Sequence, residues 1–99
     1  MRPDDEIRHK EAITDLTVYP NPTTGPVSLR FVIDESAMTT VDIYSSSGQL
    51  VQRAFEGFVE SAQVKTVELD RLVAKGIYYI RLRSGDDLKT TKLIVSDRY

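Results

Sequence analysis

Three consecutive serines, Ser45 to Ser47, are the side chains that come closest to candidate nucleophiles. A serine acts as a nucleophile only when a base, most often histidine, lies close enough to accept its proton. The only histidine is His9, and it lies in a highly charged segment near the start of the sequence. We therefore interpret the serines, with Gly48, as the turn of a hairpin and His9 as a solvated side chain. The sequence predicts that the chain is not an enzyme.

Metal and cofactor sites are not indicated either. The sequence contains no cysteine, so it has neither a disulfide framework nor a thiolate metal site. Several aspartates are candidate ligands, but their spacing does not match a calcium-binding loop. We interpret them as turn and surface residues and expect no cofactor; they are Asp15, Asp34, Asp42, Asp86 and Asp87.

The charge balance excludes another class of function. The chain has 13 basic and 15 acidic residues and a net charge of −2, whereas nucleic-acid binding needs a concentrated cationic face. No apolar stretch approaches the roughly 18–20 residues that a membrane span requires. The polar start, Arg2 to Glu6, is unlike a secretory leader. Two interpretations follow, a cytosolic protein or a piece of a longer exported precursor.

Alternating apolar and polar residues predict the elements that would position any functional side chain. Val27, Leu29, Phe31 and Ile33 share one strand face, a period of two that is typical of half-buried β-strands. Turn residues separate seven such runs, which favours one all-β domain, an antiparallel β-sandwich. The runs are Leu16–Tyr19, Val27–Ile33, Thr40–Ile43, Leu50–Phe55, Val67–Leu69, Tyr78–Arg83 and Leu88–Val95. One turn of helix is an alternative for Leu69–Ala74.

The first residues differ in character from the rest. Met1 to Ile13 carries seven formal charges and few aliphatic side chains, too little apolar area to offset the entropy of ordering. We predict a charged linker or arm over residues 1–14, with a short helix over Asp5–Ala12 as an alternative. The folded domain is predicted over residues 15–99.

Three short segments have features beyond those that predict strands and turns. The first, Pro20-Asn21-Pro22-Thr23-Thr24-Gly25, combines two prolines that must end a strand with an asparagine and a glycine suited to a turn. It is interpreted as a rigid loop that joins two sheets, and alternatively as a preshaped surface for a receptor.

The second segment is Gly76-Ile77-Tyr78-Tyr79-Ile80 and the third is Lys92-Leu93-Ile94-Val95. Alternation predicts that Tyr78 lies in the core, its hydroxyl reaching a backbone partner or the rim, and that Tyr79 lies outside beside arginines. The third segment is predicted to form a strand at a sheet edge, where unpaired backbone groups could add a strand to a partner.

In this order, the three segments resemble the type A C-terminal sorting domain of the type IX secretion system of Bacteroidetes. The similarity covers residues 16 to 95 and includes Gly48-Gln49, Gly57 and Val67-Glu68-Leu69. The resemblance implies an immunoglobulin-like sandwich of about seven strands. The stretch between Gly57 and Val67 is longer than the family pattern, and the chain ends in Asp97-Arg98-Tyr99 rather than in a lysine-type end.

The resemblance also implies a function, a signal that directs a preceding cargo from the periplasm to the cell surface. The implied partners are the translocon and a sortase-like peptidase that removes the domain by cutting before Leu16; association with the outer membrane would be peripheral. An edge-strand or swapped dimer is a further expectation. The expected recognition residues are Pro20, Asn21, Pro22, Gly25, Gly48, Gly76, Tyr78, Tyr79, Lys92, Leu93, Ile94 and Val95. The alternatives are a carbohydrate-binding or adhesive immunoglobulin-like module and a structural spacer.

Overall fold

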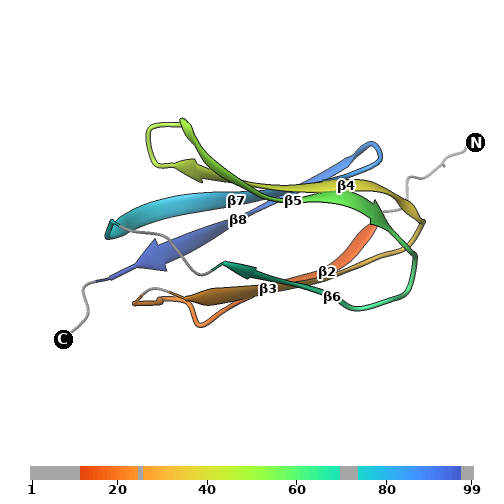
Figure 1. The fold of residues 1–99 in the computed structure, drawn as a ribbon, viewed down its shortest axis with the longest axis horizontal. Coiled ribbons are helices and arrows are strands. Elements are labelled where there is room, and N and C mark those ends of the chain that lie inside the picture. Colours follow the sequence, from red (N-terminus) through yellow and green to blue (C-terminus); the bar gives the residue numbers. More distant parts are fainter. Residues whose placement is uncertain (1–11, 25, 70–73, 97–99) are drawn as a thin grey trace, which may run out of the picture.

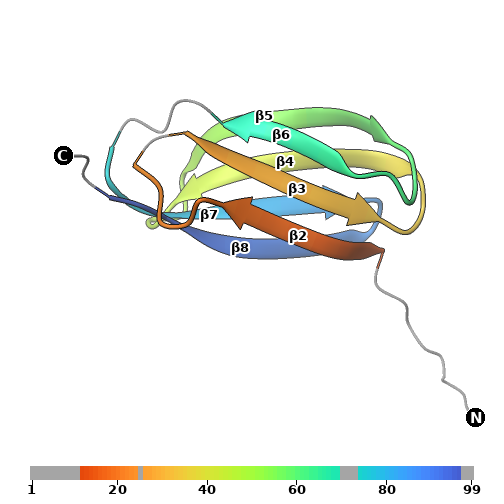
Figure 2. The ribbon, with the colours of Figure 1, turned by 90° about the horizontal axis from the view of Figure 1, so that it is seen from below.

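Seven strands and their connecting turns make up the part of the chain that the structure, a computed structural model, describes: residues 12–24, 26–69 and 74–96. The strands are β2 (Ile13–Tyr19), β3 (Val27–Ile33), β4 (Ala37–Ser45), β5 (Leu50–Val59), β6 (Lys65–Leu69), β7 (Gly76–Ser84) and β8 (Asp87–Val95). They form a three-stranded sheet, β2-β3-β6, and a four-stranded sheet, β5-β4-β7-β8, which lie face to face (Figures 1 and 2). All strand pairs within the sheets are antiparallel. The predicted all-β, immunoglobulin-like sandwich is confirmed.

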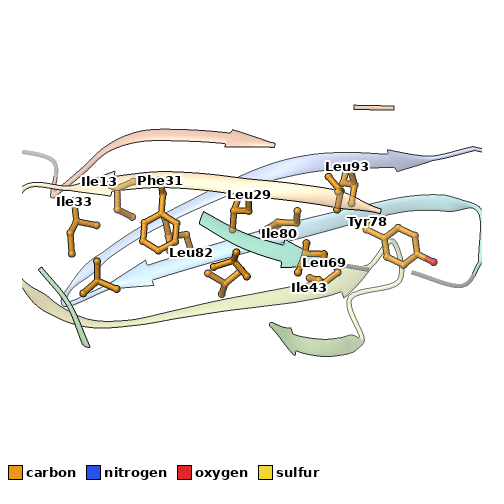
Figure 3. Close-up of a cluster of buried hydrophobic side chains, with 14 of the residues drawn as sticks. Ile13, Leu29, Phe31, Ile33, Ile43, Leu69, Tyr78, Ile80, Leu82 and Leu93 are labelled. Atoms are coloured by element: carbon orange, nitrogen blue, oxygen red, sulfur yellow. The ribbon is translucent and has the colours of Figure 1, made fainter. Parts of the chain in front are cut away.

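The core lies between the two sheets and follows the alternation in the sequence (Figure 3). In β3, the predicted inward face is fully buried over Leu29, Phe31 and Ile33. The opposite sheet contributes alternate residues of its strands, among them Ile43 and Leu82. Burial of these side chains removes apolar surface from water, the main stabilising contribution in a domain of this size.

The first strand begins earlier than its sequence pattern indicates. Ile13 is buried and pairs with Ile33, so β2 starts two residues inside the predicted arm of residues 1–14. An irregularity in the register between Ile13 and Asp15 breaks the alternation, and the pattern therefore became visible only from Leu16. The alternative helices over Asp5–Ala12 and Leu69–Ala74 fall mainly outside the described residues.

One aspartate departs from the expected surface role. Asp42 lies in the middle of β4 and is only 6% exposed. Its two carboxylate oxygens accept hydrogen bonds of 2.8 and 3.1 Å from Nε and Nη2 of Arg53 on β5. The interpretation of Asp42 as a turn or surface residue is therefore wrong, because a bidentate guanidinium compensates the burial of its charge.

Candidate recognition surface at one end of the sandwich

The segments singled out in the sequence converge at one end of the sandwich. The register pairs Tyr19 with Ser28, Ser45 with Tyr78, and Gly76 with Val95. The end of β2, the β4–β5 turn, the start of β7 and the end of β8 are therefore neighbours, on the left of Figure 1. We call this region the motif end; it comprises residues 20–24, 45–49, 76–79 and 92–96.

Asn21 connects the first segment to the third, 71 residues further along the chain. Its Nδ2 donates a hydrogen bond of 2.9 Å to the carbonyl oxygen of Lys92, and its Oδ1 accepts one of 3.0 Å from the N–H of Ile94. The side-chain amide thus pairs with β8 as a backbone peptide group of a neighbouring strand would. Two backbone groups on the outer edge of the sheet, the carbonyl oxygen of Lys92 and the N–H of Ile94, thereby have hydrogen-bond partners.

Thr23 extends the same contact with its backbone. Its N–H donates to the carbonyl oxygen of Ile94 at 2.9 Å, and its carbonyl oxygen accepts from the N–H of Ser96 at 2.8 Å. Thr23 thereby forms a parallel bridge with Val95, and its hydroxyl donates to the carbonyl oxygen of Pro26 at 2.6 Å. We call these contacts of Asn21 and Thr23 with β8 the clasp.

The clasp changes the expectation for the last strand. The placement of β8 at a sheet edge is confirmed. The expectation of unpaired backbone groups there is wrong for the carbonyl oxygen of Lys92, the N–H and carbonyl oxygen of Ile94, and the N–H of Ser96. The clasp already forms hydrogen bonds with each of them. At the other end of β8, Oδ2 of Asp87 accepts hydrogen bonds from the N–H groups of Ala12 and Ile13.

The loop that carries the clasp has a defined backbone. The peptide bonds Tyr19–Pro20 and Asn21–Pro22 are both cis. Pro20 and Pro22 have no backbone N–H and cannot donate a hydrogen bond to β8. The side chain of Asn21, between them, supplies both the donor and the acceptor that bond to β8. The expected recognition residue Gly25 lies outside the described residues.

The remaining expected recognition residues divide into two groups by burial. Tyr78 is buried, and its hydroxyl donates to the carbonyl oxygen of Ala74 at 2.6 Å, as predicted for a core tyrosine. Leu93 and Val95 are also buried in the core (Leu93 in Figure 3). These three side chains shape the motif end from inside. The exposed group, open to a partner, consists of Pro20, Asn21, Pro22, Gly48, Gly76, Tyr79, Lys92 and Ile94.

The serine-rich turn is the predicted hairpin. The N–H of Ser45 donates to the carbonyl oxygen of Gln49 at 2.8 Å, and the N–H of Gly48 donates to that of Ser45 at 2.9 Å. Gly48 has a φ of 92°, which favours glycine because a Cβ atom would be strained there. The hydroxyls of Ser45 and Ser47 bond to each other at 2.9 Å, and His9 lies outside the described residues.

The described ranges contain neither a metal-binding cluster nor a membrane-spanning helix. Over residues 12–24, 26–69 and 74–96, no three His, Cys, Asp or Glu side chains are grouped so that they could hold a metal ion. The same ranges contain no helix with the length and apolar character to cross a membrane.

The family model described as the secretion system C-terminal sorting domain matches the chain over residues 17–96. The chain belongs to this family. The match confirms the resemblance to the type IX sorting domain and spans six of the seven strands completely. A sorting domain of this kind is a signal for export to the cell surface by type IX secretion and is not itself catalytic. A search of curated protein sequences gives no match.

Proposed function

We propose that the motif end is the surface by which the type IX translocon recognises this sorting domain and the cargo that precedes it. The observation that carries the proposal is the clasp. Three segments from distant parts of the sequence meet at this end, and two of them are joined by four hydrogen bonds. Contacts that hold a surface in one shape before binding reduce the conformational entropy that the surface loses when a partner binds.

The direction of the chain supports the same assignment. Ile13, the first residue of β2, pairs with Ile33 at the end of the sandwich opposite to the motif end (Figures 1 and 2). A strand of seven residues is roughly 20 Å long, so a cargo joined ahead of β2 is held away from the motif end. The motif end then stays open to a partner while the cargo is attached.

The exposed side chains of the motif end suit a protein contact. Tyr79, Lys92 and Ile94 lie on the outer face of the four-stranded sheet, and each of them is exposed. Tyrosine is enriched among the anchors of protein interfaces, and Ile94 adds exposed apolar area on the same face. We assign direct contact to these three residues and a shaping role to Tyr78, Leu93 and Val95.

Transit and processing are further parts of the proposal. The domain passes through the periplasm, and a sortase-like peptidase then removes it. Because Ile13 is buried and its N–H is bonded to Asp87, cleavage needs an extended backbone ahead of Ala12. The cut therefore falls ahead of Ala12.

An export assay with two matched variants tests the role of the motif end. A fluorescent cargo is fused ahead of the domain, and its amount on the surface of a type IX-competent cell is measured. Ile94→Ser and Leu88→Ser both remove an exposed apolar side chain from the outer face of β8, but only Ile94 lies at the motif end. We expect Ile94→Ser to lower surface display by about fivefold or more, the effect of losing an interface anchor.

Leu88→Ser is expected to leave surface display unchanged. Unfolding curves of both purified variants establish that each is folded before export is compared. Equal export of the two variants, or export that survives deletion of residues 92–99, would refute the assignment of the motif end.

A further inference from the structure

A pocket that overlaps the motif end has the composition of a ligand site. It lies on the outer face of the four-stranded sheet under the β4–β5 turn and has a volume of about 400 Å³. Cavities of this size hold small organic ligands. Its lining consists of Tyr44, Ser45, Ser46, Gly48, Tyr79, Arg81 and Thr90.

The charge of the pocket is positive. Arg81 is its only charged lining residue, and its guanidinium lies 4.7 Å above the ring centre of Tyr44. Asp42 is directly opposite Arg81 in the register, but Arg53 occupies both carboxylate oxygens of Asp42. Within the described residues, Nε of Arg81 is buried and has no hydrogen-bond acceptor. The guanidinium stacks on Tyr44, and because its Nε is covered by protein atoms, a ligand in the pocket reaches it through the Nη groups.

The other lining groups suit a sugar ring. Tyr79 is 38% exposed and lines the same pocket as Arg81. Ser46 and Thr90 add hydroxyl groups that both donate and accept hydrogen bonds, whereas the hydroxyl of Ser45 is already bonded to that of Ser47. A carboxylate fits the fork of an arginine, an apolar ring face fits a tyrosine, and ring hydroxyls fit serine and threonine.

We propose that this pocket binds a hexuronate, a sugar ring that carries a carboxylate, as one unit of an acidic polysaccharide. Arg81 takes the carboxylate, Tyr79 packs against the ring, and the hydroxyls of the turn bond to the hydroxyls of the sugar. The pocket shares Tyr79 and the β4–β5 turn with the motif end, but its ligand is a sugar, and its binding is measured without export.

The test is a nuclear magnetic resonance titration of the isotopically labelled chain with methyl glucuronoside. Methyl glucoside, which has the same ring without the carboxylate, and N-acetylaspartate amide, which has a carboxylate without the ring, are titrated in parallel. We expect saturable shifts at Gly48, Tyr79 and Thr90 with the glucuronoside and binding at least about tenfold weaker with either control, since each lacks one half of the contact.

Substitutions locate the binding. Arg81→Gln is expected to weaken glucuronoside binding at least about tenfold, because a charge-assisted contact is lost. Arg83→Gln removes the same charge from the same face of β7 but outside the pocket. It is expected to leave glucuronoside binding within about twofold, because the salt in the buffer screens a charge that does not touch the ligand. Tyr79→Ser keeps Arg81 and is expected to weaken binding as well, and the spectrum of each variant reports whether it is folded.

Three results would overturn the proposal. The first is equal binding of the glucoside and the glucuronoside, the second is equal loss with Arg81→Gln and Arg83→Gln, and the third is binding of the aspartate amide alone, which would indicate a site for acidic peptides.

Discussion

The two outer strands of the four-stranded sheet, β8 and β5, are protected from unwanted pairing in different ways. The outer edge of β8 is bonded at both ends, by the clasp at Lys92–Ser96 and by the backbone N–H groups that reach Asp87. β5 is ten residues long and pairs with β4 alone in its sheet. Over the described residues, no backbone hydrogen bond reaches its outer edge.

β5 instead uses the general devices of an exposed edge. It carries charged side chains at Arg53 and Glu56, and its pairing with β4 is irregular at two points. Charges and bulges discourage a second strand from adding to an open edge. The apolar side chains of Leu50 and Phe58 remain exposed on it.

The difference gives the first and third segments of this chain a structural reason to lie together at β8. Many sequences supply a charged or irregular edge, so β5 requires no particular residue. The clasp depends on one asparagine whose two side-chain atoms both find partners on β8, and on Thr23 behind it. Such a contact places a specific demand on the residue at position 21, because both side-chain atoms of Asn21 are used.

The largest contrast between the two edges is expected from leucine truncations. Leu93 on β8 is fully buried, whereas Leu50 on β5 is 54% exposed. Leu93→Ala should lower the free energy of unfolding by about 2–5 kcal/mol, because it leaves a cavity in the core. Leu50→Ala should change it by less than about 0.5 kcal/mol. Urea unfolding measures both, and similar losses in the two variants would contradict the placement of the core.

A smaller effect is expected at the Asp87 end of β8. Asp87→Ala removes a charged acceptor that bonds the N–H groups of Ala12 at 2.6 Å and Ile13 at 3.2 Å. The loss should be about 1.5–3 kcal/mol in the free energy of unfolding, as for hydrogen bonds to charged groups. Asp86→Ala, in the neighbouring exposed turn, is the control and should be nearly neutral. A stable Asp87→Ala variant with unchanged amide exchange at Ile13 would argue against this contact.

Within the clasp, Asn21 should contribute less, since its two bonds are exposed to solvent. Asn21→Ala is expected to cost about 1 kcal/mol and to speed amide hydrogen exchange at Ile94, whose N–H loses its acceptor. Asn21→Asp keeps an acceptor for Ile94 but loses the donor to Lys92, so exchange at Ile94 should stay slow. Fast exchange at Ile94 in the native chain would show that the clasp is not formed in solution.

The sequence allowed the sandwich and the position of the last strand to be predicted, because both follow from local patterns. Alternation along β3 determines which side chains face inward, whatever the rest of the chain does. The core position of Tyr78 and the hairpin at Gly48 follow from the same local rules.

The clasp and the buried Asp42 could not be predicted in this way. The contact of Asn21 with β8 spans 71 residues and depends on how the two sheets are placed, which no local pattern encodes. Asp42 stands in a run that alternates correctly, but the burial of its charge depends on Arg53 reaching it across the β4–β5 pair. Ile13 was missed because an irregular register hides its alternation.

The smallest expected effect is at the open edge of β5. Val51 is 48% exposed, so Val51→Lys should change the free energy of unfolding by less than about 0.5 kcal/mol. If charge is what protects this edge, the added lysine should also lower any concentration-dependent association, because a charge in an edge strand opposes the approach of a second strand. Sedimentation velocity at several concentrations, with Ile94→Lys as the matched change on β8, distinguishes the two edges. On β8 the clasp already blocks pairing, so Ile94→Lys should leave the association state unchanged, and a change there as large as on β5 would show that the clasp does not close its edge.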